Sequence, residues 1–220
     1  FKVRDKLEIN TGAGRDAVRI DGLTNFGDVW IRTGAADDLV TMKNANAGVN
    51  KDSLLWFDLG AGNDTLELGS APNALGVVHG FNLRVDARDG NDRVEMRDAF
   101  FDFGVAVQLG IGDDVLNMAN VQARTNMSVR GEAGNDTVNL TQVEAAENFF
   151  AFMGEGSDTL NVVNLKTQKA ELNGGDGDGF DRLFFGQSPQ VGSLIRSAFE
   201  EVNGQKLLKK VAVAGQPSAR

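Results

Sequence analysis

A glycine–x–aspartate turn followed by alternating apolar residues returns at intervals along the whole chain. The clearest copies read "DLGAGNDTLEL" (58–68), "QLGIGDDVLNM" (108–118), "RGEAGNDTVNL" (130–140) and "FMGEGSDTLNV" (152–162). Aligned on the aspartate, the copies number eight and lie 22, 26, 28, 22, 22, 22 and 23 residues apart: Asp16, Asp38, Asp64, Asp92, Asp114, Asp136, Asp158 and Asp181. A period of this length indicates one supersecondary unit per repeat, stacked on its neighbours.

The residues around each turn predict short strands. After Asp114, for example, Leu116 and Met118 flank the polar Asn117, and before it Val105 and Val107 show the same alternation. Period-2 alternation is typical of a strand with one buried face. A third short segment is marked by Val121, Val143 and Leu165. Three strands and three corners in about 22 residues predict an all-β fold, a right-handed parallel β-helix (a solenoid) of about eight coils.

Two regions are expected along the chain. Residues 1–185 form the β-helix repeat domain, and residues 186–220 form a C-terminal cap and tail, because a solenoid needs a cover over its last coil. In the second region five apolar residues have roughly helical spacing: Val191, Leu194, Ile195, Phe199 and Val202. The chain starts at Phe1, and we expect a processed protein or a fragment of a longer one.

Composition excludes several functions. A formal net charge of −9 argues against binding nucleic acid through phosphates, which requires clustered lysine and arginine. The chain has no cysteine, so it has no disulfide and no thiol nucleophile, and no apolar run is long enough to span a membrane. His79 is the only histidine and has no partner in the sequence that would indicate catalysis, so no catalytic residue is predicted. The acidity suits a cation as ligand.

Stacked aspartates would place like charges about 4.8 Å apart, where repulsion must be offset. Each carboxylate could accept backbone N–H groups inside its own turn, as in Asx-turns. Alternatively, Ca²⁺ could bind between successive turns, because carboxylate and turn carbonyl oxygens form the all-oxygen site that this ion prefers. The candidate calcium ligands are Asp64, Asp114, Asp136, Asp158 and Asp181 with Gly110, Gly112, Gly134, Gly154 and Gly156. The strongest candidates are the pairs Asp114–Asp136 and Asp136–Asp158.

The segments "LGAGNDTLE", "LGIGDDVLN" and "MGEGSDTLN" resemble the calcium-binding nonapeptide of RTX (haemolysin-type) repeat proteins. The resemblance covers residues 10–185 approximately, and "FEEVNG" at 199–204 is similar to segments that often follow such arrays. It implies a secreted or cell-surface protein whose turns bind Ca²⁺ through the aspartate and the glycine-turn carbonyls.

A second candidate site lies on the strand before the turn. Trp30 and Trp56 precede successive aspartates by eight residues and should point outward, next to the insertions at 43–54 and 69–82. Two stacked exposed tryptophans could hold a sugar ring; alternatively, the loops fold over them and bury them. Four charged residues should share this face, where they could serve catalysis or form ion pairs between coils: Arg32, Asp58, Arg84 and Asp86.

These observations favour an exported structural or adhesive β-helix module that Ca²⁺ stabilises. The alternative is a glycan-active β-helix enzyme, resembling a polysaccharide lyase, or a sugar-binding module that contacts extracellular polysaccharide at Trp30 and Trp56. Columns of amides are expected to be structural ladders: Asn117, Asn139 and Asn161, with Asn120 and Asn164 one corner further.

Overall fold

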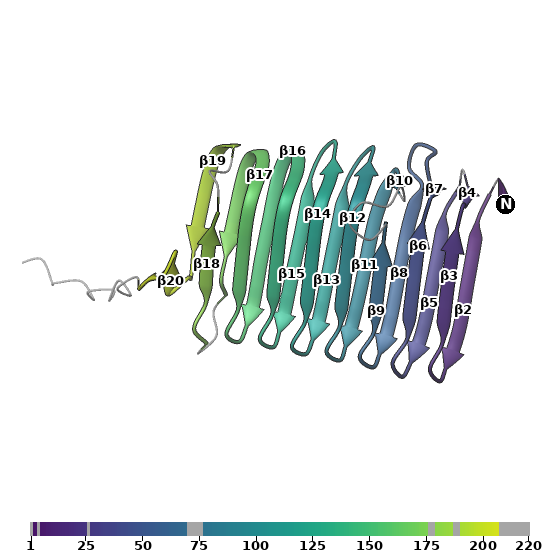
Figure 1. Ribbon diagram of the computed structural model, residues 1–220, viewed down its shortest axis with the longest axis horizontal. Coiled ribbons are helices and arrows are strands. Elements are labelled where there is room, and N and C mark those ends of the chain that lie inside the picture. The colour runs from purple at the N-terminus through teal and green to yellow at the C-terminus, as the bar shows by residue number, and fades with distance from the viewer. Residues whose placement is uncertain are drawn as a thin grey trace, which may run out of the picture.

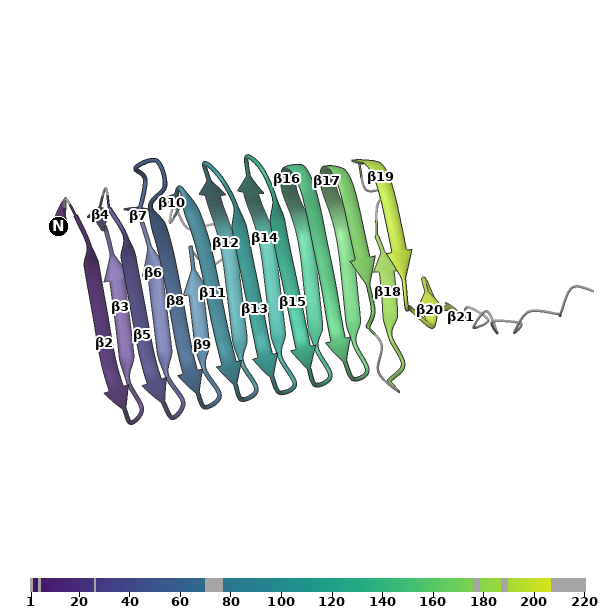
Figure 2. The same cartoon turned by 180° about the vertical axis from the view of Figure 1, so that it is seen from behind.

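The computed structural model describes residues 2–3, 5–25, 27–69, 77–175, 179–186 and 190–206. These residues form 21 strands and no helix. All strand pairs are parallel except the last one, and the chain winds into a β-solenoid of about eight turns, as predicted. Figures 1 and 2 show the coils side by side in chain order, with the N-terminal coil at one end and β20 at the other.

Three ladders of parallel strands run along the solenoid. The first contains β2 (Leu7–Ala13), β5 (Val29–Ala35), β8 (Leu54–Ala61), β11 (Asn82–Asp89), β13 (Val105–Ile111), β15 (Met127–Ala133), the ends of β16 (Thr137–Glu155) and β17 (Thr159–Asn173), and β19 (Gln190–Ser197). The second contains β3 (Ala17–Asp21), β6 (Leu39–Lys43), β9 (Thr65–Leu68), β12 (Arg93–Phe101), β14 (Val115–Ala123), the starts of β16 and β17, β18 (Arg182–Phe185) and β20 (Glu201–Val202).

The third ladder is made of shorter segments. It contains β1 (Lys2–Val3), β4 (Thr24–Asn25), β7 (Ala45–Ala47), β10 (Val78–Gly80), the ends of β12 and β14, and the middles of β16 and β17. It confirms the predicted third segment, since Val121, Val143 and Leu165 stack in register. Residues 45–47 of the insertion at 43–54 thus form β7 and continue this ladder. Residues 70–76 of the other insertion lie outside the described residues.

The register explains why apolar residues alternate. Val105 pairs with Met127 and Leu116 with Val138, so residues one repeat apart lie directly over one another. Each apolar column therefore becomes a continuous stripe of the interior, where Val107, Leu116 and Val138 are almost completely buried. Burial of this kind is the main favourable term in folding.

Counted back from Asp158 and Asp181, Leu172 should pair with Phe149 and Gly177 with Gly154, but the last coil departs from this alignment. Leu172 pairs with Ala151 and not with Phe149, and Gly175, rather than Gly177, approaches Gly154. The cause is a register shift between Ala145 and Asn148, which shortens one corner while the next corner is longer. Gly177 itself lies outside the described residues.

The expectation of helical spacing after residue 190 is wrong. Residues 190–197 form β19, whose Leu194 and Ile195 pair with Ala170 and Glu171 of β17. The ladders therefore extend beyond residue 185, and the last described residues add β20 and β21 (Gln205–Lys206) as a short antiparallel pair. Residues 207–220, including the end of the predicted cap, lie outside the described residues.

The glycine two residues before each aspartate is required by close stacking. At Gly112 the backbone has φ 138°, a conformation that side-chain-bearing residues rarely adopt. A Cβ built on Gly112 would lie 2.0 Å from the carbonyl oxygen of Gly90 in the preceding coil. Ala36 is the one residue at this position that is not glycine, and it takes φ 88°.

We therefore expect Gly112→Ala to destabilise the solenoid. The strained backbone alone should cost about 1–3 kcal/mol, and displacement of the Gly90 carbonyl should add to it. Equilibrium unfolding in urea measures the loss. Gly104→Ala is the matched control, because a Cβ there meets its nearest atom at 3.4 Å and φ is not positive. Equal stability of the two variants would contradict this account of the turn.

Candidate functional site

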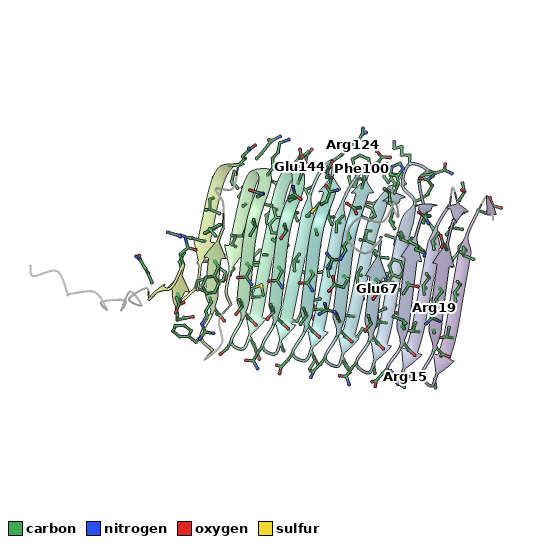
Figure 3. All side chains as sticks on the ribbon, viewed as in Figure 1. Arg15, Arg19, Glu67, Phe100, Arg124 and Glu144 are labelled. Atoms are coloured by element: carbon green, nitrogen blue, oxygen red, sulfur yellow. The ribbon has the colours of Figure 1, made fainter. Side chains whose placement is uncertain are left out.

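The turn aspartates lie in single file along one edge of the solenoid, the lower edge in Figure 1. Each follows the corner between the first and second ladders, and Figure 3 labels Arg15, the residue before the first aspartate, at this edge. The side chains are buried: Asp114 and Asp158 have no exposed surface, and Asp136 keeps 1%. The structure therefore brings the predicted aspartates Asp64, Asp114, Asp136, Asp158 and Asp181 into one buried column.

Each carboxylate accepts a hydrogen bond from the preceding coil and not from its own turn. The main-chain N–H of Asp114 donates to Oδ1 of Asp136 at 2.9 Å, and that of Asp136 donates to Oδ1 of Asp158 at 2.7 Å. The same bond joins every successive pair from Asp16 to Asp181, and Glu200 takes the role after Asp181. The interpretation as Asx-turns was therefore wrong about the partner: the carboxylates connect neighbouring coils.

The second oxygen of the carboxylate has no partner. Seven Oδ2 atoms are buried without a hydrogen bond, those of Asp16, Asp38, Asp64, Asp92, Asp114, Asp136 and Asp158. Oδ2 of Asp136 faces the interior, because a Cβ built on Gly131 would lie 2.2 Å from it. In register with Gly131 stand Leu109 and Met153, both fully buried. An oxygen that faces apolar side chains without a donor strongly disfavours the ionised form.

The pKa values of the column reflect this environment. Burial raises the pKa of Asp136 to about 8, although the N–H of Asp114 lowers it, and the charges of neighbouring aspartates add to the rise. The pKa of Asp92 is also raised to about 8, and those of Asp64, Asp114 and Asp158 to about 6, again mainly by burial. Desolvation thus outweighs the hydrogen bond from the neighbouring coil.

The predicted turn glycines form the backbone of the same corner. The N–H groups of Gly112 and Gly134 donate at 2.8 Å to the carbonyls of Ala133 and Glu155 in the following coil. The five predicted glycines all have φ between 106° and 138°: Gly110, Gly112, Gly134, Gly154 and Gly156. Close stacking of the coils accounts for these glycines without a bound ion.

The sequence analysis missed a second ladder at this corner. From Asp37 to Ser157, the side chain one residue before the aspartate accepts the main-chain N–H of the following coil; Asp113 Oδ1, for example, accepts from Asn135 at 2.7 Å. The bonds continue through Asp37, Asn63, Asn91, Asn135 and Ser157. The signal was present as the recurring Asn-Asp and Asp-Asp pairs. Two acceptor columns, one buried and one exposed, therefore bind the turns together in opposite directions.

The carboxylates fit a calcium site only in part. The seven carboxylates from Asp16 to Asp158 contribute one unpartnered oxygen each, but these oxygens are buried, and that of Asp136 faces the interior. Ca²⁺ takes six to eight oxygen ligands, and within the described ranges no group of three or more His, Asp or Glu side chains is arranged to hold a metal ion. The free Oδ2 atoms would be the ligands contributed by the side chains.

The tryptophan face is built as the sequence predicts. Trp30 pairs with Trp56 in the first ladder, both are half-buried on the outer face, and their rings meet edge to face at 5.4 Å. Cationic side chains also contact the two rings. Lys6 Nζ lies 3.3 Å from the centre of the Trp30 ring, and the Arg32 guanidinium lies 4.8 Å from the centre of the Trp56 ring. These cations occupy the ring surface that a sugar would use.

The charged residues beside the tryptophans form ion pairs within and between coils. Arg32 contacts Glu8 at 2.7 Å, and Arg84 contacts Asp86 at 2.7 Å. Arg88 contacts Asp58, and Trp56 Nε1 donates to Asp86 at 2.6 Å. The four residues expected on this face are therefore all paired, which supports the ion-pair interpretation.

The remaining sequence expectations are readily placed. Asn139 and Asn161 each donate at 2.7 Å to the preceding asparagine of the Asn117 column, which confirms that ladder. Asn120 instead donates to Asp98, so the second amide column is not a hydrogen-bonded ladder. His79 Nε2 lies 2.9 Å from Asp102 Oδ2. Among the described residues no helix could cross a membrane.

Comparisons with protein-family models, with curated proteins and with solved structures yielded no match. The resemblance of the turns to RTX repeats therefore stays a prediction that depends on the sequence motif.

The buried column predicts an unusual pH dependence. Between the unfolded pKa near 3.9 and the folded value of about 8, Asp136 binds more protons in the folded state, so stability falls as pH rises. Its contribution is complete below about pH 4 and is lost toward pH 8. The pKa values of Glu8 and Asp21 are lowered, so these two groups make stability rise with pH, but only at acid pH. Thermal unfolding between about pH 5.5 and 8 avoids that range.

Asp136→Asn should become more stable relative to the unmodified protein as the pH rises through this range. The amide keeps the Oδ1 acceptor and has no charge to bury. Asp113→Asn makes the same change at an exposed neighbour and should alter the pH profile much less, because burial is the main cause of the raised pKa of Asp136 and the charge of Asp113 only adds to it. A melting temperature that increases from pH 5.5 to 8, with no change of profile in Asp136→Asn, would refute the assignment.

Proposed function

We propose that the chain is a non-catalytic structural module, a stiff rod built from stacked coils. The observation that carries the proposal is the hydrogen bond that joins each turn aspartate to the next, repeated from Asp16 to Asp181. The residues that the chain repeats most strictly are those used between coils. A function of holding shape and distance needs this regularity.

Stiffness would follow from the contacts on every side of the coil. Backbone ladders join neighbouring coils on three sides, and the two acceptor columns add bonds at the turn. In a solenoid each repeat contacts only its neighbours, so stability is roughly a sum of equal interfaces. The proposal that the rod is exported and adhesive depends on the resemblance of its turns to RTX repeats.

A double spin-label measurement tests the rod. Asn10 and Asn173 occupy one column, seven coil steps apart, so the rod predicts a narrow distance distribution near about 34 Å at about 4.8 Å per step. Because the chain has no cysteine, Asn10→Cys/Asn173→Cys can be labelled selectively. Asn10→Cys/Arg130→Cys, five steps apart, should give about 24 Å. A broad distribution in both pairs would contradict a stiff module.

The seven unpartnered Oδ2 atoms favour an addition to this function, the binding of Ca²⁺ between coils. A cation would neutralise carboxylates that otherwise retain protons. The ligands would be the Oδ2 atoms of Asp114, Asp136 and Asp158 with nearby turn carbonyls, in the sequence pattern that resembles RTX turns. Occupation would require the corner to open slightly, since these oxygens have almost no accessible surface.

Calcium should then raise the melting temperature, and more so at pH 8 than at pH 5.5, because protons compete for the same oxygens. The measurement compares about 1–5 mM Ca²⁺ with EDTA, with Mg²⁺ as the control ion, since extracellular calcium modules bind at about 10⁻⁴–10⁻³ M. Asp136→Asn should reduce the effect and Asp113→Asn should not. Identical melting curves in Ca²⁺ and EDTA at pH 8 would remove calcium and leave the rod proposal intact.

A further inference from the structure

An open groove runs along the solenoid at the corner between the second and third ladders. It encloses about 360 Å³ and crosses the last coils, near the edge where Figure 3 labels Glu144. We call it the amide groove, because five of its nine lining residues carry a side-chain amide. The lining residues are Asn120, Gln122, Gln142, Val143, Glu144, Asn164, Leu165, Lys166 and Gln190.

Two columns of side chains form the walls of the amide groove. Asn120, Gln142 and Asn164 hold corresponding corner positions, all with left-handed backbone at φ 55–58°. The opposite wall is a strand column in register from coil to coil: Gln122, Glu144, Lys166 and Gln190. Between the walls Val143 and Leu165 point inward and are buried. The groove therefore follows the solenoid axis, and along its corner wall one amide side chain recurs in each coil from Asn120 to Asn164.

The amides of the groove are available for a ligand. Across the described residues no side-chain hydrogen bond engages Gln122, Gln142, Asn164 or Gln190; Asn120 alone is used, through Asp98. The two charged residues of the lining, Glu144 and Lys166, neutralise each other at 2.6 Å. The groove thus offers hydrogen-bond donors and acceptors without an unpaired charge, although the chain as a whole has a net charge of −9.

We propose that the amide groove binds an uncharged, linear polysaccharide whose axis lies along the solenoid. A carboxamide donates and accepts at once, as a hydroxyl group does, so the two match without ionisation. An anionic polymer would need unpaired arginine or lysine here, and the one lysine of the lining is paired. This inference does not depend on calcium and would give the rod a partner.

The repeat distance favours a sugar chain over a peptide. Equivalent amides recur about every 4.8 Å along the axis, whereas an extended peptide advances about 3.3 Å per residue and would fall out of step within two coils. A pyranose linked through opposite sides of its ring advances by nearly one coil. Each sugar of such a chain would thus lie beside one coil.

Isothermal titration of the full chain with neutral oligosaccharides of β-1,4-glucan, xylan, mannan and α-1,4-glucan tests the proposal, with polygalacturonate as the anionic comparison. At least one neutral series should bind. Its affinity should rise with length and level off near four sugars, because Gln122 and Gln190 are separated by three coil steps.

The deciding variant is Gln142→Gly/Asn164→Gly, which removes two amides from left-handed positions that glycine adopts without strain. We expect at least a tenfold loss of affinity. Asn44→Gly makes the same change at φ 51° in a coil far from the groove and should bind normally. Should the double glycine variant fail to fold, Gln122→Ala/Gln190→Ala tests the other wall with the same expectation.

Three results would overturn the proposal. One is that no neutral oligosaccharide binds; another is that polygalacturonate binds more tightly than every neutral series. The third is binding that survives the groove variants but is lost in Trp30→Ala/Trp56→Ala, which would place the sugar on the tryptophan face.

Discussion

The structure depends on backbone stacking at the distance of one strand spacing, and the demands of that stacking are greatest at the corner before each aspartate. There the carbonyl of one coil points at the α-carbon of the next, which leaves room for glycine alone at Gly112 and Gly134. The same approach leaves an N–H group without a ladder partner, and the carboxylate of the following coil accepts it. Glycine and aspartate are thus two consequences of one geometric constraint.

The aspartate column has a cost that its hydrogen bonds do not offset. A carboxylate that accepts a single N–H, with its other oxygen buried and without a partner, is poorly solvated when ionised. The exposed column at Asp113 performs a similar stacking task without this penalty. The difference between the two columns is burial, so a proton or a cation is needed only on the inner one. A motif that resembles a calcium site and a motif that serves stacking therefore contain the same residues.

Much of the fold followed from the sequence because residues one repeat apart are in contact. Alternation at Leu116 and Met118 located strands, and the spacing of the aspartates located coils. The helical prediction failed where stacking is one-sided. Within the described residues β19 pairs only with β17, and all its residues except Val191 are exposed, so burial does not distinguish Leu194 from Ile195. At the site, the sequence identified the aspartates but not the N–H groups that they accept. An aspartate is equally suited to accept an N–H of its own turn or one of the neighbouring coil.

The outward columns show where a solenoid of this kind can acquire specificity. Inward positions are mostly apolar, and the position two residues before the aspartate is glycine in every coil but that of Ala36. The outward column that passes through the amide groove instead reads Phe100, Gln122, Glu144, Lys166 and Gln190 in successive coils. Glu144 and Lys166 form an ion pair between coils, but all five side chains lie outside the buried core, so they can vary without loss of the fold. Recognition along the rod would then depend on these residues, while the stacked backbone sets the distance between them.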